Sequence, residues 1–395
     1  MPKFDTTTCD KIKSYFQAGY KPTQEQWYAW FQAIQDGIEG HKHHETGGCY
    51  KGKGDAAPVE FPDTWHDQHL KNIRAWRRRL CARPDLAALA SPKYWTGEEG
   101  QNWAGALVSD GEYLYVGLEG WPARALKLDP NTMATLDHWT GLEDQILCRA
   151  IVVKDDHVYA GLRTSPASVI AFRKQDMQKT ATWEADEGLN ECMALAWDKT
   201  HVYAGLNTSP ARVVKLKPPT LRHVSDWVGS VKHLGCRSLL YNGEHLYAGL
   251  SGFEGKVVKI DPAEMQTLAQ WNLVGGPMNC RALATDGGYI YAGFYDVPAV
   301  VSKLRRDDLT VAGTWTGDEV QEYCAALCYN GEALYVGLAT WPGRIVKLTV
   351  PDLQFVAEWE AEGEINQCQA LAWDGLFLYA GFNTSPAKVA RMVMT

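Results

Sequence analysis

Several features that mark common classes of protein are missing from this chain. No apolar run is long enough to cross a lipid bilayer, and the first residues, MPKFDTTTCDKIK, lack the apolar core of a signal peptide. We therefore expect no membrane span and a mature protein that begins at its first residues. Basic residues do not outnumber acidic ones, since the net charge is −8. Nucleic acid is therefore not an expected partner.

Recognisable catalytic motifs are missing too. The sequence has no nucleophile elbow, P-loop, zinc-protease motif, dinucleotide fingerprint or sialidase-type aspartate box. Carboxylates are plentiful, but the sequence cannot place two of them across one substrate. A non-enzymatic role is therefore favoured, and a lyase or hydrolase that acts on polysaccharide remains the second alternative.

The ten cysteines lack the spacing of a disulfide framework, but six of them mark a repeat. These six recur every 44 residues, and Ala104 stands one period before the first; they are Cys148, Cys192, Cys236, Cys280, Cys324 and Cys368. Seven units therefore start in the chain. Because alanine serves in one unit, thiol chemistry is not required, and we expect these small side chains to pack around a central axis in a protein from a reducing compartment.

Each unit reads as four short strands. In the unit that starts at Cys236, the segments are residues 236–241, which end at the hairpin turn Asn242-Gly243, and then 245–250, 256–260 and 267–271. A period in the forties with four strands per unit is typical of a β-propeller blade. The sequence therefore predicts an all-β seven-bladed β-propeller. No blade carries a long insertion of the kind that houses catalytic residues, which favours a scaffold or binding disc.

The last unit is incomplete, and its missing segment lies upstream. A tryptophan follows each of the first six starts at a fixed offset, and Trp95 lies one period before the first of them, Trp139. We expect the strand around Trp95 to be the outermost strand of the blade that begins at Cys368, because this closes the ring and removes two sheet edges. The predicted domains are a mainly helical region over residues 1–90 and the propeller over residues 91–395.

The N-terminal region contains an aromatic helix. Thr23 and Gln26 form a capping box, after which apolar side chains fall on one helical stripe: Trp27, Trp30, Phe31 and Ile34. A stripe this apolar does not face water alone. It predicts packing on the propeller or on another copy of the chain, as an oligomerisation surface.

Residues 16–48, FQAGYKPTQEQWYAWFQAIQDGIEGHKHHETGG, resemble the N-terminal module of tailed-bacteriophage and phage-derived fibre or adaptor proteins. The positions that carry the resemblance are Gly19, Pro22, Thr23 and Phe31. The propeller is similar to the YVTN type, with LYVGL at residues 114–118 and 334–338. The resemblance implies a component of the virion or of a phage tail, cytoplasmic before assembly. It would bind other virion or tail proteins and form a homo-oligomer, with a trimer favoured.

His41 and His43 are candidate metal ligands. Imidazoles two residues apart in an extended segment point to one side, and a threefold axis could gather three such pairs into an octahedral site. The resemblance implies the same, since similar H-x-H steps hold iron in phage fibres. The alternative is a solvated loop with no bound metal, and apart from this site we expect no cofactor.

The loops between the second and third strands carry the candidate ligand-binding residues. Trp121, Phe253 and Trp341 replace the serine that three other blades have there, and Arg124, Arg212 and Arg344 follow. Flat aromatic rings beside polar groups suit a sugar or a peptide. Two roles remain open: a propeller that binds a host-surface glycan or protein or a neighbouring subunit, and an intracellular scaffold or lectin-like module. The aromatic side chains could also simply cover blade junctions.

The first prediction concerns assembly. If residues 1–90 form the oligomerisation module, the full chain has a solution mass of about three times 44.0 kDa, whereas a chain that starts near residue 90 is monomeric. Light scattering on both chains measures this. Two monomers would contradict the fibre analogy.

Overall fold

The computed structural model describes residues 92–252, 255–272 and 279–393. In this part of the chain the regular secondary structure consists of strands, which form seven antiparallel four-stranded sheets. The predicted seven-bladed β-propeller is therefore confirmed. The helices, the histidine pair and the oligomerisation stripe predicted for residues 1–90 lie outside the described residues, and the domain boundary stays a prediction.

Each sheet is one blade, numbered from the N-terminus. Blades 1 to 3 consist of β2 (Ala104–Ser109), β3 (Leu114–Leu118), β4 (Arg124–Leu128) and β5 (Thr135–Thr140); β6 (Cys148–Lys154), β7 (His157–Leu162), β8 (Ser168–Arg173) and β9 (Lys179–Glu184); and β10 (Cys192–Trp197), β11 (Val202–Leu206), β12 (Arg212–Lys217) and β13 (Arg222–Val228). Blades 4 and 5 consist of β14 (Leu234–Tyr241), β15 (Leu246–Ser251), β16 (Lys256–Asp261) and β17 (Gln266–Asn272); and β18 (Cys280–Thr285), β19 (Tyr289–Phe294), β20 (Val300–Arg305) and β21 (Val311–Thr316). Blade 6 consists of β22 (Cys324–Tyr329), β23 (Ala333–Leu338), β24 (Arg344–Thr349) and β25 (Phe355–Glu360), and blade 7 of β26 (Cys368–Trp373), β27 (Leu378–Phe382), β28 (Lys388–Met392) and β1 (Lys93–Thr96).

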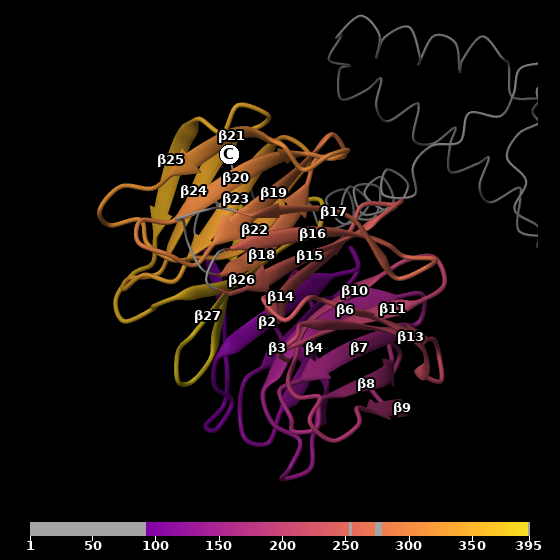
Figure 1. The fold of residues 1–395 in the computed structure, drawn as a ribbon. Coiled ribbons are helices and arrows are strands. Elements are labelled where there is room, and N and C mark those ends of the chain that lie inside the picture. Colours follow the sequence, from indigo (N-terminus) through magenta and orange to yellow (C-terminus); the bar gives the residue numbers. More distant parts are fainter. Residues whose placement is uncertain (1–91, 253–254, 273–278, 394–395) are drawn as a thin grey trace, which may run out of the picture. The chain divides into compact units, whose positions relative to one another are not determined.

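The first strands of the blades surround the axis. In Figure 1 they lie in the middle of the ring, with outer strands such as β9, β13 and β25 at the rim. Each first strand contacts the first strands of both neighbouring blades, and β26 contacts β2. Burial follows this order: second strands such as β3 are buried along their whole length, whereas fourth strands such as β5 are half exposed. A strand covered on both faces needs the continuous apolar run seen in LYVGL.

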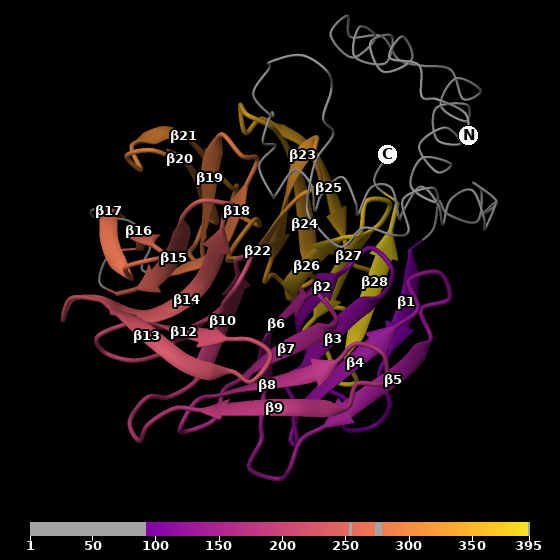
Figure 2. The ribbon, with the colours of Figure 1, turned by 90° about the vertical axis from the view of Figure 1, so that its right-hand side faces the viewer.

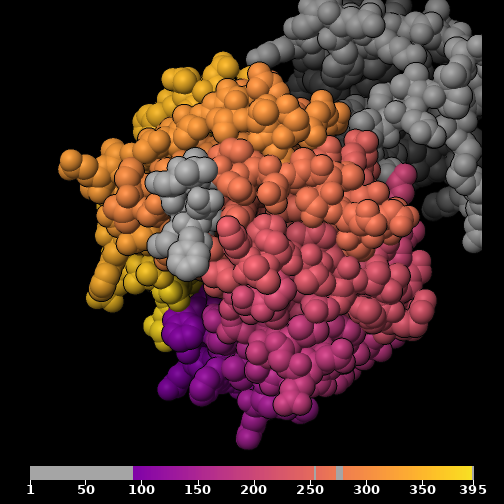
Figure 3. Space-filling model, in the orientation of Figure 1, coloured from indigo at the N-terminus to yellow at the C-terminus, as the bar shows by residue number. Residues whose placement is uncertain are grey.

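The ring is closed by β1. This strand pairs antiparallel with β28, with Trp95 opposite Val389, so blade 7 contains both ends of the propeller. Figure 2 shows the indigo β1 beside the yellow β28, and on the surface the colours follow the sequence around the ring (Figure 3). Trp95 is buried, and its Nε1 donates to Thr135 Oγ1 of blade 1 at 3.0 Å. The predicted closure is confirmed.

The repeated cysteines fill notches between blades. All six are completely buried and none forms a disulfide. Each sulfur lies beside a glycine of the preceding blade's second strand, so that a Cβ on Gly205 would come within 2.6 Å of Cys236 Sγ. Gly381 faces Ala104 in the same way. Burial raises the pKa of these thiols, to about 12 for Cys192 and Cys280. The cysteines are packing residues, as expected.

A second repeated feature is a side-chain cap on the turn between the first two strands of a blade. Six blades place Asp or Asn there, and its Oδ1 accepts two backbone N–H groups; these residues are Asp110, Asp198, Asn242, Asp286, Asn330 and Asp374. The tyrosine five positions later is completely or almost completely buried in every blade, and in blade 7 Tyr379 donates to Asp374 Oδ2 at 2.7 Å. The turn is thus bonded to the blade core.

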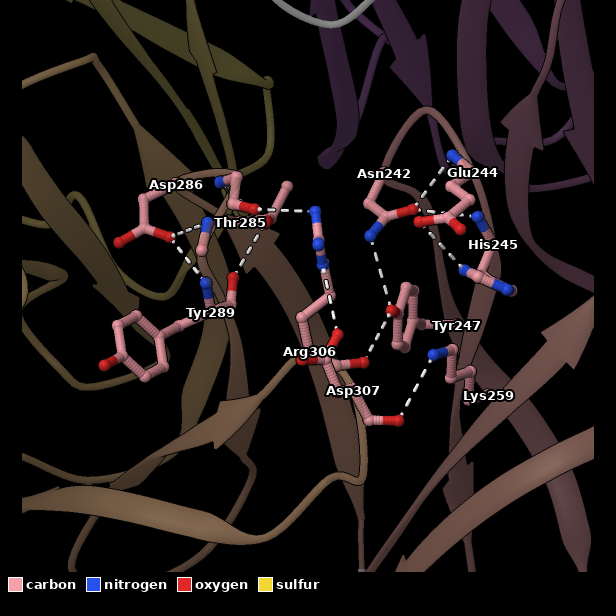
Figure 4. A network of polar contacts seen from close by, with 12 residues as sticks. Asn242, Glu244, His245, Tyr247, Lys259, Thr285, Asp286, Tyr289, Arg306 and Asp307 are labelled. Carbon is pink, nitrogen blue, oxygen red and sulfur yellow. Dashed lines mark hydrogen bonds and ion pairs between the residues drawn. The ribbon is translucent and has the colours of Figure 1, made fainter. Parts of the chain in front are cut away.

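Buried cations join neighbouring blades on the side of these turns. The third-strand lysine of blade 4, Lys259, donates to the carbonyl of Asp307 in blade 5 at 3.2 Å, and Tyr247 donates to the carbonyl of Arg306 beside it at 3.1 Å (Figure 4). Lysines of blades 1, 3 and 5 make the corresponding bond. In blade 7, Arg391 reaches the carbonyl of Pro130 in blade 1 at 2.9 Å. These bonds run around the ring and across its closure.

The turn device yields a matched pair of variants. Asp374→Ala removes the acceptors of two backbone N–H groups and of a buried hydroxyl, so we expect it to lower the free energy of unfolding by about 2–4 kcal/mol. Asp374→Asn is expected to cost about 1 kcal/mol or less, because asparagine caps the same turn in blades 4 and 6. Urea unfolding measures both. Equal stability of the two variants would contradict this role.

The contact between Gly205 and Cys236 can be tested with a double-mutant cycle. Gly205→Ala brings the new Cβ against Cys236 Sγ, and overpacking of this kind costs about 1–3 kcal/mol. Cys236→Ala removes that sulfur, so the double variant is expected to be more stable than the sum of the single effects by roughly 1 kcal/mol. Urea unfolding of the three variants measures the coupling. Simple additivity would show that sulfur and glycine do not compete for one space.

Candidate functional site

Two sets of loops lie on one face of the propeller, here called the loop face. One set joins the second strand of a blade to its third, and the other joins the fourth strand to the next blade. Hydrogen bonds connect them: Ala123 N donates to Gln145 O at 2.8 Å, and Gly141 N donates to Ala123 O at 2.9 Å. Equivalent bonds recur in other blades, for example at Ala167 and Ala211. The sequence-predicted ligand-binding loops therefore belong to this face.

The centre of the loop face is formed by three positions in each blade, together called the axial mouth. One precedes the Cys or Ala that starts each repeat, one follows that residue, and one comes directly after the Leu or Phe near the end of the second strand. By position these are Trp103, Leu147, Glu191, Gly235, Asn279, Tyr323 and Gln367; Gly105, Arg149, Met193, Arg237, Arg281, Ala325 and Gln369; and Glu119, Arg163, Asn207, Ser251, Tyr295, Ala339 and Asn383. The starting Cys or Ala and the Leu or Phe of the second strand, which adjoin these positions, hardly change between blades, whereas the three positions vary. The blade framework therefore does not dictate them.

Backbone geometry presents these side chains at the mouth. The position before the innermost strand has a positive φ in at least five blades, as at Leu147 (54°) and Gln367 (49°). Its N–H donates to the loop between the second and third strands of the preceding blade, as in Leu147 N to Gly120 O at 3.2 Å. Its carbonyl accepts from the residue after the second strand of its own blade, as in Arg163 N to Leu147 O at 3.1 Å. Non-glycine residues adopt this conformation at a cost. The repeated hydrogen bonds hold it.

An ion-pair chain joins blades 1, 2 and 3 at the mouth. Arg149 Nη1 donates to Glu119 Oε1 at 2.6 Å and to Gly105 O at 3.2 Å. Arg163 lies between two carboxylates, 3.8 Å from Glu119 Oε2 and 3.1 Å from Glu191 Oε1. Burial opposes ionisation of Glu191, but the bond from Asn207 and the charge of Arg163 outweigh it and lower its pKa. Glu191 is therefore an ion-pair partner and not a proton donor at neutral pH.

On the other side, Arg281 reaches across blade 6. Its Nη2 donates to Gln369 Oε1 of blade 7 at 2.8 Å, although Arg281 belongs to blade 5. Ala325 occupies the equivalent position of the blade between them and leaves room for this. The guanidinium lies over the ring of Tyr295, 4.6 Å from its centroid, and Tyr295 stacks on Tyr323 at 4.7 Å. The arginine plane is thereby oriented by aromatic stacking.

Arg237 of blade 4 is the third arginine at the second position of an innermost strand. Its Nε donates to Ser251 Oγ at 3.4 Å. Burial, followed by repulsion from Arg163 and Arg149, lowers its pKa against the attraction of Glu191. The pKa of Arg281 is also lowered, first by burial and then by Arg149. Guanidinium groups donate hydrogen bonds and do not transfer protons, so this arrangement can hold acceptor groups.

The predicted ligand-binding residues lie farther out on the loop face. Trp121 and Trp341 are 76% and 79% exposed, on blades 1 and 6, with blade 7 between them. Arg124 Nη1 donates to Gly100 O at 2.6 Å. Arg212 pairs with Asp226, and Arg344 with Glu358 and Glu360. Phe253 lies outside the described residues, so the structure places five of the six.

Sequence reasoning missed the axial mouth. Its signal was the residue directly after each repeated cysteine, which is arginine in three units and Met, Ala or Gln in the others. In the structure each innermost strand has a β-bulge at this point, so the residue after the cysteine has no partner in the second strand and its side chain is free to turn toward the axis. Within the described residues, no group of three or more His, Cys, Asp or Glu side chains is arranged to hold a metal ion.

Comparison with known proteins finds a likeness in fold alone. No family model matches the chain, and no curated protein matches it. Among solved structures, it is similar to the WD40 repeats of RRP9, with a TM-score of 0.61 and 13% identity over 76% of this chain and 97% of that one. It is similar to the structure of U3-55K with the same TM-score and identity, over 76% and 98%. At this identity the likeness shows a shared propeller fold. The described part of the chain contains no helix long and apolar enough to cross a membrane.

Proposed function

We propose that this propeller is a non-enzymatic binding scaffold that receives a protein partner on its loop face. The observation that carries the proposal is the exposure of Trp121 and Trp341 on that face. Tryptophan is enriched among the residues that dominate binding energy in protein interfaces, where it inserts into a pocket of the partner. The pair spans blades 6 to 1, which suits an extended or broad partner better than a small molecule.

The regular blades and the fold likeness support the same role. In the sequence the blades have the same length, and no blade carries an inserted lid or catalytic loop. One of the two structural neighbours is described as WD40 repeats, and it shares the propeller architecture of this chain. A rigid disc with variable loops on one face is a scaffold on which partner contacts can change without altering the core.

A second candidate is a component of a bacteriophage virion or tail, whose propeller binds a host-surface glycan or protein or a neighbouring subunit. Its support is the resemblance of residues 16–48, which lie outside the described residues. The same chain would then bind other virion proteins through residues 1–90. The solution-mass measurement described above tests the assembly that this candidate requires.

Peptide selection against the full chain tests the scaffold proposal. Peptides selected from a random library on the wild-type protein are expected to bind Trp121→Ala or Trp341→Ala about tenfold or more weakly, since loss of an interface tryptophan typically costs about 2 kcal/mol or more. Titration calorimetry with the selected peptides measures the affinities.

The matched control is Phe355→Ala. Phe355 is an exposed aromatic residue, but it begins the fourth strand of blade 6 and so lies at the end of the blade away from the loop face. This variant is expected to bind like the wild type. Equal affinity of the wild type and both tryptophan variants would refute a loop-face docking site centred on these residues.

A further inference from the structure

The axial mouth carries more positive than negative charge. Its charged residues are four arginines and two glutamates, namely Arg149, Arg163, Arg237, Arg281, Glu119 and Glu191. Four cations and two anions leave two positive charges, although the whole chain has a net charge of −8. The excess is therefore local to the axis.

The excess is concentrated on two arginines. Glu119 and Glu191 are both engaged by Arg149 or Arg163. Within the described residues, Arg237 and Arg281 form no ion pair with a carboxylate; their side-chain hydrogen-bond partners are the hydroxyl of Ser251 and the amide of Gln369. A largely buried guanidinium that is not directly paired with a carboxylate is unfavourable, because the more distant attraction of Glu191 for Arg237 and of Glu119 for Arg281 does not offset the loss of hydration. The lowered pKa values of both groups agree with this.

The fold does not require these arginines. The same position holds Gly105, Met193 and Ala325 in other blades, whose sheets have the same four-strand order. Apolar or small residues therefore satisfy the packing, and they avoid the cost of a buried charge. A structural role does not account for three arginines directed at one axis from blades 2, 4 and 5.

The arginines are arranged to present donors to the axis. Stacking on Tyr295 fixes the plane of the Arg281 guanidinium, and the bond to Gln369 holds it extended over blade 6. Bonds to Glu119 and Gly105 fix Arg149. A guanidinium carries five N–H donors in a rigid fork that matches the oxygens of phosphate and carboxylate groups. Ordered donors lose little freedom when they bind.

We propose that the axial mouth binds a small dianion of the phosphate or dicarboxylate class, held by Arg237 and Arg281 with Arg149 as a further donor. A charge of two matches the unbalanced charge of the mouth. The two classes share a pair of negative charges on the oxygens of planar carboxylate groups or of a tetrahedral phosphate group. Guanidinium groups bind such oxygens with two parallel N–H donors. This site is separate from Trp121 and Trp341, so it does not depend on the proposed partner docking.

Titration calorimetry of the full chain tests the site with two probes, inorganic phosphate and succinate, at an ionic strength kept constant with sodium chloride. We expect at least one probe to bind the wild type with a stoichiometry of one, and the two arms distinguish phosphate from dicarboxylate. Arg237→Gln and Arg281→Gln are expected to bind that probe about tenfold or more weakly, because each removes a charged donor. Arg173→Gln is the matched control, since it removes the same charge from an exposed arginine that pairs with Asp176.

If a variant binds no probe, thermal unfolding shows whether it has lost the binding site or has lost its folded structure. In a buffer free of phosphate and dicarboxylate, Arg281→Gln is expected to melt at or above the wild-type temperature, because it relieves repulsion among the arginines, while the rise in melting temperature caused by the bound probe is lost. Arg281→Lys should keep part of that rise, since it keeps the charge but not the planar fork. The proposal is overturned if neither probe binds more strongly than chloride, if the double variant Arg237→Gln and Arg281→Gln keeps the response, or if Arg281→Gln is destabilised in the probe-free buffer.

Discussion

Close approach of the innermost strands is the constraint on which the rest of this propeller depends. Seven blades meet around one axis only if their first and second strands come near enough to share a layer of small atoms. Glycine in the second strand of one blade and the sulfur of the next blade's cysteine provide that layer, and Gly381 with Ala104 completes it. Because the contact is tight, the blade positions around it accept little variation. The constancy of the repeat is a consequence of this packing.

The geometry of the innermost strands separates the residues that pack between blades from those that form the axial mouth. A β-bulge follows each packed cysteine, so the next residue lies outside the regular pairing and is not needed for packing between blades. These positions differ between blades, and they bring Arg149, Arg237 and Arg281 near enough to repel one another from three separate units. A ring thus collects side chains that lie one or two periods apart in the chain, as the bond between Arg281 and Gln369 illustrates.

The two faces of the disc have different roles in this arrangement. On the face with the turns between first and second strands, acidic and amide residues cap backbone N–H groups, and buried lysines bond to the next blade's carbonyls. The first of these polar groups hold a turn within one blade, and the second link neighbouring blades. On the loop face, the backbone hydrogen bonds are made within and between loops, and large side chains such as Trp121 and Trp341 remain exposed. These two tryptophans are not used by the blade framework.

The sequence by itself determined the number of blades, their four strands and the closing strand around Trp95, because a 44-residue period and its local turn residues act at short range and repeat. It also indicated that the cysteines pack, since alanine replaces one of them. Only the tertiary structure decided which side chains meet at the axis, because the contacts among Arg149, Glu119, Arg281 and Gln369 join different blades. It likewise showed that Arg212 and Arg344 pair with carboxylates of their own blades, while Trp121 and Trp341 stay exposed. Ring closure creates these long-range neighbours, and no local pattern encodes them.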